Sequence, residues 1–107
     1  MTEKHNDLNI STFNIQQWAK DRNLHTADPS KQMLKLMEEV GELSQGLAKD
    51  NQEQIVDSIG DIYVVLTILS LQLDLDIQLC ARQAYNEIKD RKGQMVNGVF
   101  VKESDLT

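Results

Sequence analysis

Residues 62–71 read Ile-Tyr-Val-Val-Leu-Thr-Ile-Leu-Ser-Leu. They form the second half of a helix that the sequence predicts over about residues 52–73. Apolar side chains surround this helix, and a helix that is apolar on every side must be buried on every side. Three other short helices can hardly cover it within one subunit. We therefore expect a homodimer, or a dimer of such dimers, with a self-sufficient bundle as the alternative.

Start signals place two helices before this segment. The first is predicted to begin at Ser11 or Thr12, either of which can cap a helix, and to end near Asn23. The second is predicted to begin at Asp28-Pro29, where a capping acid is followed by proline in the first turn, and to end near Lys49. Asp50-Asn51 follows, ends this helix and can cap the next one.

A fourth helix is predicted to begin at Asp74 or Asp76 and to stop at Gly93. Residues 95–101 are expected to form a short turn between extended apolar pieces, within a tail that covers residues 93–107. The sequence thus predicts an all-α, four-helix bundle-like fold in a single domain over residues 1–107, with residues 1–10 frayed.

The composition is that of one globular domain: 107 residues, 40% hydrophobic and 26% charged. The 17 acidic residues outnumber the 11 lysines and arginines, and the formal net charge of -6 argues against a general nucleic-acid binder. The single cysteine, Cys80, excludes an internal disulfide and fits a reducing compartment. No basic-then-apolar leader opens the chain, and the interrupted apolar run of residues 62–71 is far shorter than the ~20 residues of a membrane span. We expect a cytoplasmic protein that binds neither nucleic acid nor membrane.

The second helix carries the acidic segment Glu38-Glu39-Val40-Gly41-Glu42. At 100° per residue, its three glutamates fall opposite the apolar stripe of the same helix. That stripe consists of Met33, Leu36, Met37, Val40, Leu43 and Leu47. For this helix alone, a solvated acidic face is the alternative to a functional site.

The third helix carries a second acidic segment, Asp57-Ser58-Ile59-Gly60-Asp61, in which the two aspartates lie one turn apart on one side. That side continues as Val64, Val65 and Ile68, so Asp61 is expected at the edge of a packed interface. No Lys or Arg lies between residues 50 and 81, and buried carboxylates without counter-ions are costly.

A divalent cation is the obvious neutraliser of these two acidic segments. All the available ligands are carboxylate oxygens, which select Mg²⁺ or Mn²⁺ over zinc. Gly41 and Gly60 each lie inside a helix beside the carboxylates. We expect them to mark a close helix crossing that brings the two acidic segments together.

The fourth helix carries the basic counterpart. Arg82, Asn86 and Lys89 share one face of it, opposite its apolar residues, and Arg91 and Lys92 follow. An acidic metal site and a basic patch suit a metal-bound polyphosphate. The alternative is that the cations favour the helix C-terminus through its dipole, which does not account for Asn86.

Three segments in this order carry a resemblance: residues 38–42, residues 57–61 and Ala84-Tyr85-Asn86-Glu87-Ile88-Lys89-Asp90-Arg91-Lys92-Gly93. Together they resemble the MazG-like nucleotide pyrophosphohydrolases. These belong to the all-α nucleoside triphosphate pyrophosphatase superfamily, with the dimeric dUTPases and the phosphoribosyl-ATP pyrophosphatases. The resemblance extends from Trp18 to about Lys102. An E-E-x-x-E pattern alone has low specificity, whereas three segments at this spacing are strong evidence.

The resemblance implies Mg²⁺-dependent hydrolysis of a (deoxy)nucleoside triphosphate to the monophosphate and pyrophosphate. It assigns metal binding to Glu39, Glu42 and Asp61. The family's second motif is usually E-x-x-D, and here Ser58 stands where the family has glutamate. Asp57, one turn before Asp61, is the proposed replacement ligand. Glu38 is assigned to orienting the attacking water, as a further member of the catalytic set.

On the last helix, the resemblance assigns phosphate and sugar contacts to Asn86 and Lys89, with Arg82 or Arg91 helping Lys89 to neutralise the terminal phosphates. Trp18 is expected in the core of the first helix, with stacking on a base as the alternative. Two other functions stay open. One is hydrolysis of a phosphoribosyl-nucleotide or a modified nucleotide, and the other is a catalytically inactive helical oligomer that serves as an interaction module.

Overall fold

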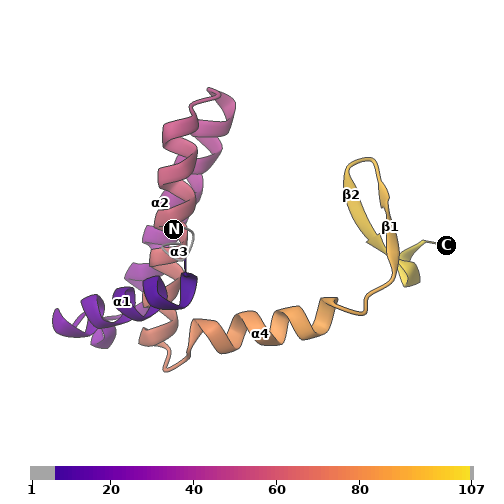
Figure 1. Cartoon of the computed structure of the whole chain (residues 1–107). Helices are drawn as coiled ribbons and strands as arrows, with labels where there is room; N and C mark the ends of the chain where they lie inside the picture. The colour runs from indigo at the N-terminus through magenta and orange to yellow at the C-terminus, as the bar shows by residue number, and fades with distance from the viewer. Residues whose placement is uncertain (1–6, 107) are drawn as a thin grey trace. The chain divides into compact units, whose positions relative to one another are not determined.

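The computed structural model describes residues 7–106. Within them the chain forms four α-helices and one two-stranded sheet, which confirms the predicted all-α class (Figure 1). The elements are α1 (Leu8–Asp21), η2 (Leu24–Thr26), α2 (Pro29–Ala48), α3 (Gln52–Gln72), α4 (Ile77–Ile88), β1 (Gly93–Val96), β2 (Val99–Lys102) and η3 (Glu103–Asp105). By its internal contacts the chain divides into two compact units, the first ending at Ile77 and the second beginning at Gln78.

Helices α2 and α3 form the hairpin at the centre of the first unit, and both begin at the predicted capping residues. The Asp28 carboxylate accepts from the Ser30 backbone N–H (2.9 Å), ahead of a proline in the first turn. The Asn51 side chain accepts from the Gln54 backbone N–H (3.2 Å) and caps α3. Between the helices, the Asn51 N–H donates to the Gly46 carbonyl (2.9 Å), so a short turn sets the register of the hairpin.

Helix α1 begins earlier than the sequence predicts. Asp7 is its cap and accepts from the Asn9 N–H (2.8 Å), so the assignment of the cap to Ser11 or Thr12 is wrong. Residues 8–10 are helical, not frayed, and residues 1–6 lie outside the described residues.

Thr12 has a tertiary role instead of a capping one. Its buried hydroxyl donates to the Leu8 carbonyl (2.7 Å) and lies 2.5 Å from the Tyr63 hydroxyl, which attaches α1 to α3.

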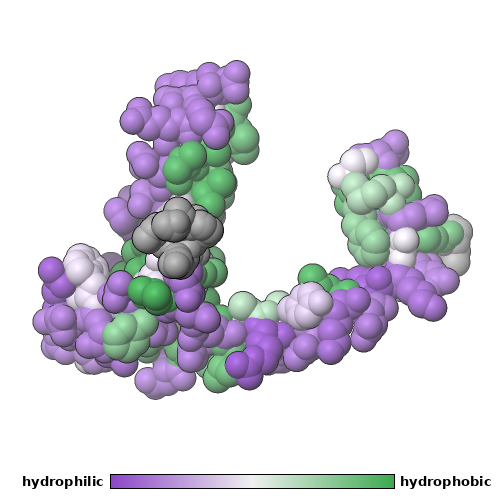
Figure 2. Space-filling model, in the orientation of Figure 1, coloured by the Kyte–Doolittle hydropathy of each residue, from purple (hydrophilic) through white to green (hydrophobic). Residues whose placement is uncertain are grey.

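The face of α2 that contacts α3 also differs from the predicted stripe. The less exposed positions of α2 include Leu36, Glu39, Leu43 and Gly46, spaced three and four residues apart. Four members of the predicted stripe are instead exposed to between 45% and 63%, namely Met33, Met37, Val40 and Leu47. Figure 2 shows apolar side chains open to solvent along the α2–α3 pair.

Helix α3 is long and apolar enough, by length and composition, to span a membrane. The prediction from the sequence counted only the apolar run of residues 62–71, not the whole 21-residue helix. A core helix of a soluble protein passes the same test, so this one helix is weak evidence. Val65 and Ile68 are buried, at 4% and 3% exposure, and supply two of the buried apolar residues of the first unit.

The second unit consists of most of α4 and the hairpin. Helix α4 begins directly after Asp76, one of the two predicted starts, and ends at Ile88, so the predicted stop at Gly93 is wrong. Gly93 begins β1 and pairs with Lys102 of β2, and a Cβ at this position would clash with the Val101 carbonyl oxygen. The glycine is therefore needed for strand pairing rather than for helix termination.

The hairpin confirms the predicted turn between extended pieces. Asn97 and Gly98 have positive φ values of 51° and 82°, as a two-residue hairpin turn requires at both positions. Val96 pairs with Val99 across this turn. None of the α4 residues is buried, so the apolar face that was predicted to point inward is uncovered within the unit as described.

Candidate functional site

The register of the α2–α3 hairpin decides which acidic residues meet. Gly46 packs against Gln54, where an added Cβ would lie 3.2 Å from the Gln54 Cγ. The Gln54 amide nitrogen donates to the Glu42 carbonyl (2.9 Å) and to the Gln45 side-chain oxygen (3.0 Å). Because the helices run antiparallel, moving one turn back along α2 from Gly46 corresponds to moving one turn forward along α3 from Gln54. Glu42 therefore lies level with Ser58, and Glu39 level with Asp61.

The close approach of the two helices occurs at Gly46 and not at the predicted glycines. A Cβ at Gly41 or Gly60 would meet no atom within 4 Å, and both residues are exposed. Their proposed role as crossing points is therefore wrong. The turn between the helices and the contact at Gly46 bring the acidic segments together. Gly46 lies one to two turns nearer than Gly41 to the C-terminal end of α2.

Glu39 lies in the helix–helix contact, although the sequence placed it on the solvent side of α2. The residue is only 6% exposed. Its Oε1 atom is buried and has no hydrogen-bond partner, and its Oε2 atom lies 3.6 Å from the Lys35 Nζ. A buried carboxylate oxygen without a partner is costly, so this position is suited to accept a ligand.

Electrostatics single out the same residue. Burial raises the pKa of the Glu39 carboxyl above its ordinary value, and the Glu42 and Asp61 carboxylates raise it further. Lys35 lowers it in part. Three carboxylates from the two predicted segments therefore lie near enough to interact, with one of them desolvated.

The remaining acidic residues lie on one side of the hairpin. Counting 100° per residue from Glu39, Glu42 lies about 60° and Glu38 about 100° to one side of the contact line on α2. On α3 the angles are measured in the same way from the buried Ser58. Asp61 lies about 60° and Asp57 about 100° from it, in the same direction of rotation as on α2. On two antiparallel helices the same rotation leads to the same side of the pair.

These residues fit a divalent cation by their chemistry. The donors are carboxylate oxygens, and one of them, the buried Glu39 Oε1, has no hydrogen-bond partner among the described residues. In the rotamers of this structure, no three His, Cys, Asp or Glu side chains within residues 7–106 converge closely enough to hold an ion. Glu42 and Asp61 are exposed at the hairpin surface, where side chains change rotamer within nanoseconds. Glu39, in contrast, is held by packing.

Two positions of the second acidic segment differ in exposure. Ser58, where the family resemblance expects glutamate, is 2% exposed and lies inside the helix contact. Asp57 is exposed beside it, and its assignment as a replacement ligand stays a prediction.

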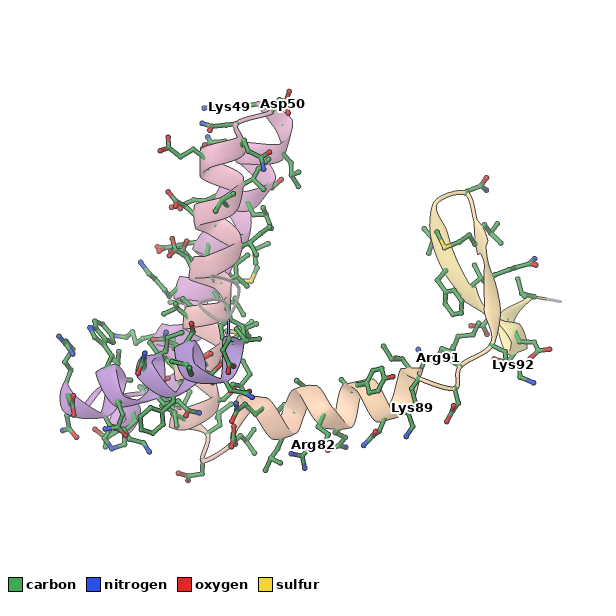
Figure 3. All side chains as sticks on the ribbon, in the orientation of Figure 1. Lys49, Asp50, Arg82, Lys89, Arg91 and Lys92 are labelled. Carbon is green, nitrogen blue, oxygen red and sulfur yellow. The ribbon has the colours of Figure 1, made fainter. Side chains whose placement is uncertain are left out.

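The basic residues on the last helix lie in the second unit. Figure 3 shows Arg82 and Lys89 on the same side of α4, as their spacing predicts. Asn86 falls on that side by the same count, and Arg91 follows the helix end. All four are exposed, and their assignment to substrate binding stays a prediction.

Lys35 was not among the site residues predicted from the sequence, and Trp18 does not lie in the core where it was expected. Lys35 lies four residues before Glu39, a spacing that brings side chains together on a helix and that was visible in the sequence. Trp18 is 47% exposed, so its expected place in the core is wrong. The Arg22 guanidinium lies over its ring, 4.3 Å from the ring centre.

Comparisons with known proteins point to the same segments. The model of the MazG nucleotide pyrophosphohydrolase domain family matches residues 27–96, which contain all of α2, α3 and α4. An uncharacterized 18.2 kDa protein in the rep-hol intergenic region of Haemophilus phage HP1 (strain HP1c1) is 52% identical over 71 residues. These cover 65% of this chain and 44% of the relative, so the chain spans less than half of the relative's length. No solved structure matches the chain.

Proposed function

Because the chain belongs to the MazG nucleotide pyrophosphohydrolase family, we propose that it hydrolyses a nucleoside triphosphate to the monophosphate and pyrophosphate, with Mg²⁺ as its cofactor. The observation that carries the proposal is the buried Glu39 Oε1, which lacks a partner beside two further carboxylates. A family match alone does not give a site, whereas an unsatisfied desolvated carboxylate indicates where a cation binds.

Each acidic residue has a distinct role in this proposal. Glu39 would be the fixed ligand, and Glu42 and Asp61 would close on the ion from the two helices. When bound, the ion neutralises phosphate oxygens and lowers the pKa of water. Glu38, exposed on the same side of the hairpin, would accept a proton from the attacking water and orient it. Asp57 would serve as the outer ligand.

Pyrophosphate release from a panel of (deoxy)nucleoside triphosphates, with and without Mg²⁺, tests the proposal. We expect Glu39→Gln and Asp61→Asn each to lower turnover by about 100-fold or more, the scale for the loss of one group that stabilises the transition state electrostatically. Glu53→Gln is the matched control. It removes one exposed negative charge from the first turn of α3, outside the acidic segments, and should leave turnover unchanged.

The outcomes separate this proposal from the other two functions. Turnover of phosphoribosyl-nucleotides or modified nucleotides alone would keep the site and change the substrate. Absence of both turnover and metal binding would favour an inactive interaction module. Near-normal turnover in both Glu39→Gln and Asp61→Asn would remove the site assignment.

A second copy of the chain is the partner that we propose for the uncovered side of the α2–α3 hairpin. Val40 and Ile59 each lie about 100° from the contact line of their helix, on the side away from the carboxylates. Both are exposed, at 45% and 56%. A copy docked there would keep the acidic sides of two chains of net charge -6 apart, and a symmetric dimer needs such a self-complementary patch.

Light scattering coupled to size-exclusion chromatography tests the dimer. We expect a mass of at least twice the 12.2 kDa of one chain. Val40→Asp should lower the mass toward that of one chain, whereas Leu8→Asp, at an apolar position on α1 that is 58% exposed, should not. A wild-type monomer at micromolar concentration would contradict the proposal.

A further inference from the structure

An apolar cavity of about 350 Å³ lies between α1 and α3 in the first unit. Its lining is Asn14, Ile15 and Trp18 from α1 and Val64 from α3. The α1 residues are spaced three and four apart and so share one face of the helix. The volume falls within the range of small-molecule sites, which combine apolar and aromatic walls with a few polar groups. The surface that lines this cavity is almost entirely apolar.

The cavity adjoins the acidic side of the hairpin. Val64 follows Asp61 by three residues, so the two side chains are neighbours one turn apart on α3. Asp61 and Val64 are rotated from Ser58 in the same direction around α3, so both lie on the side of the hairpin that carries the acidic residues. The Thr12–Tyr63 hydroxyl contact fixes α1 against α3 next to this wall. A ligand bound at Asp61 through phosphates therefore has an apolar cavity within reach of its other end.

The indole ring of Trp18 is held in place for contact with a flat ligand. Arg22 donates from its guanidinium to the Trp18 carbonyl (3.0 Å) and lies over one face of the ring. A separation of 4.3 Å leaves no room for a base between guanidinium and ring. A ligand in the cavity must therefore use the other face or the edge of the indole.

We propose that this cavity binds the base of the nucleotide, with Trp18, Ile15 and Val64 packing on the base. The inference rests on the proposed function, because it places the base next to phosphates held at Asp61. It adds a site that the family match does not contain, since the matched residues begin at residue 27, beyond the end of α1.

Fluorescence of Trp18, the single tryptophan of the chain, reports on the cavity directly. The wild-type protein is titrated in Mg²⁺ with hydrolysis-resistant α,β-imido deoxynucleoside triphosphates of each base, and separately with inorganic tripolyphosphate. We expect the nucleotides to change the emission and tripolyphosphate to leave it unchanged while still binding by calorimetry. The base whose titration gives the lowest dissociation constant identifies the preferred ligand.

Variants supply the second readout. Trp18→Ala should lower kcat/KM for nucleoside triphosphates at least about 5-fold, the lower end of measured base–aromatic stacking, and leave tripolyphosphate affinity unchanged. Asn14→Ala, at an exposed position that does not support the fold, should also lower kcat/KM, which keeps the test valid if Trp18→Ala unfolds. Phe13→Ala removes an aromatic side chain that is 60% exposed on the same helix and does not line the cavity, so it should have no effect.

Two results would overturn the base site. In the first, nucleotides and tripolyphosphate both bind without any change in tryptophan emission, which leaves the proposed function standing. In the second, Trp18→Ala and Asn14→Ala both keep wild-type kcat/KM. Binding of neither nucleotide nor tripolyphosphate would reject the proposed function together with the base site.

Discussion

At the scale of single residues, burial of the Glu39 carboxyl lowers the stability of the fold at neutral pH. Its raised pKa means that the native state holds the carboxyl proton more tightly than the unfolded state, so ionisation above the ordinary value of 4.5 destabilises the fold. We expect metal-free Glu39→Gln to be more stable than wild type at pH 7, by on the order of 1 kcal/mol. The difference should vanish as the pH falls through the folded pKa toward 4.5. Urea unfolding across this pH range measures it, and a less stable variant at pH 7 would contradict the argument.

Lys35 is the cation that pairs with Glu39, through the Oε2 atom, in this structure. Lys35→Met removes the 3.6 Å ion pair and the repulsion between the ammonium group and an incoming cation. We expect Mn²⁺ to bind this variant about 2–5-fold more tightly, the scale of a partly exposed ion pair. Calorimetric titration measures the affinity, with Lys31→Met, one turn earlier and also exposed, as the control. Weaker binding by Lys35→Met would show that Lys35 supports the site instead.

At the scale of elements, the three helix glycines of the α2–α3 hairpin should respond to alanine in opposite directions. A Cβ at Gly46 would press on Gln54, whose side chain is held by hydrogen bonds to Glu42 and Gln45, so we expect Gly46→Ala to destabilise by about 1 kcal/mol. Gly41→Ala and Gly60→Ala meet no atom within 4 Å and should stabilise by roughly 0.5–1 kcal/mol through helix propensity. Chemical unfolding of the metal-free variants measures all three. Equal signs for Gly46 and Gly60 would contradict this packing.

At the scale of the whole molecule, the second unit lacks a core of its own. Within residues 78–106 no side chain is buried, α4 has only 12 residues, and a two-stranded hairpin is marginal alone. We expect a peptide of residues 78–107 to show little helix by circular dichroism. Cooperative thermal unfolding of the isolated peptide would contradict this expectation.

The predictions from sequence succeeded where the signal is local. Asp28 and Asn51 cap their helices as expected because a cap depends on a side chain and the next three backbone N–H groups. The turn in the tail follows from Asn97-Gly98 for the same reason. The error at α1 was a choice between neighbouring cap candidates, and Asp7 replaced Thr12 because the Thr12 hydroxyl contacts Tyr63, which is 51 residues away.

Capping, periodicity and charge are properties of neighbouring residues, so the four helices, their order and the two acidic segments follow from the sequence alone. Which stripe of α2 meets α3 depends instead on how the two helices pack. Two stripes with partly shared members compete there, and periodicity does not distinguish them. The contact between Gly46 and Gln54 places the stripe that contains Glu39 and Gly46 against α3. It buries Glu39 between the helices and leaves Val40 outside, so that one residue of the acidic segment becomes a buried carboxylate whose Oε1 atom lacks a hydrogen-bond partner.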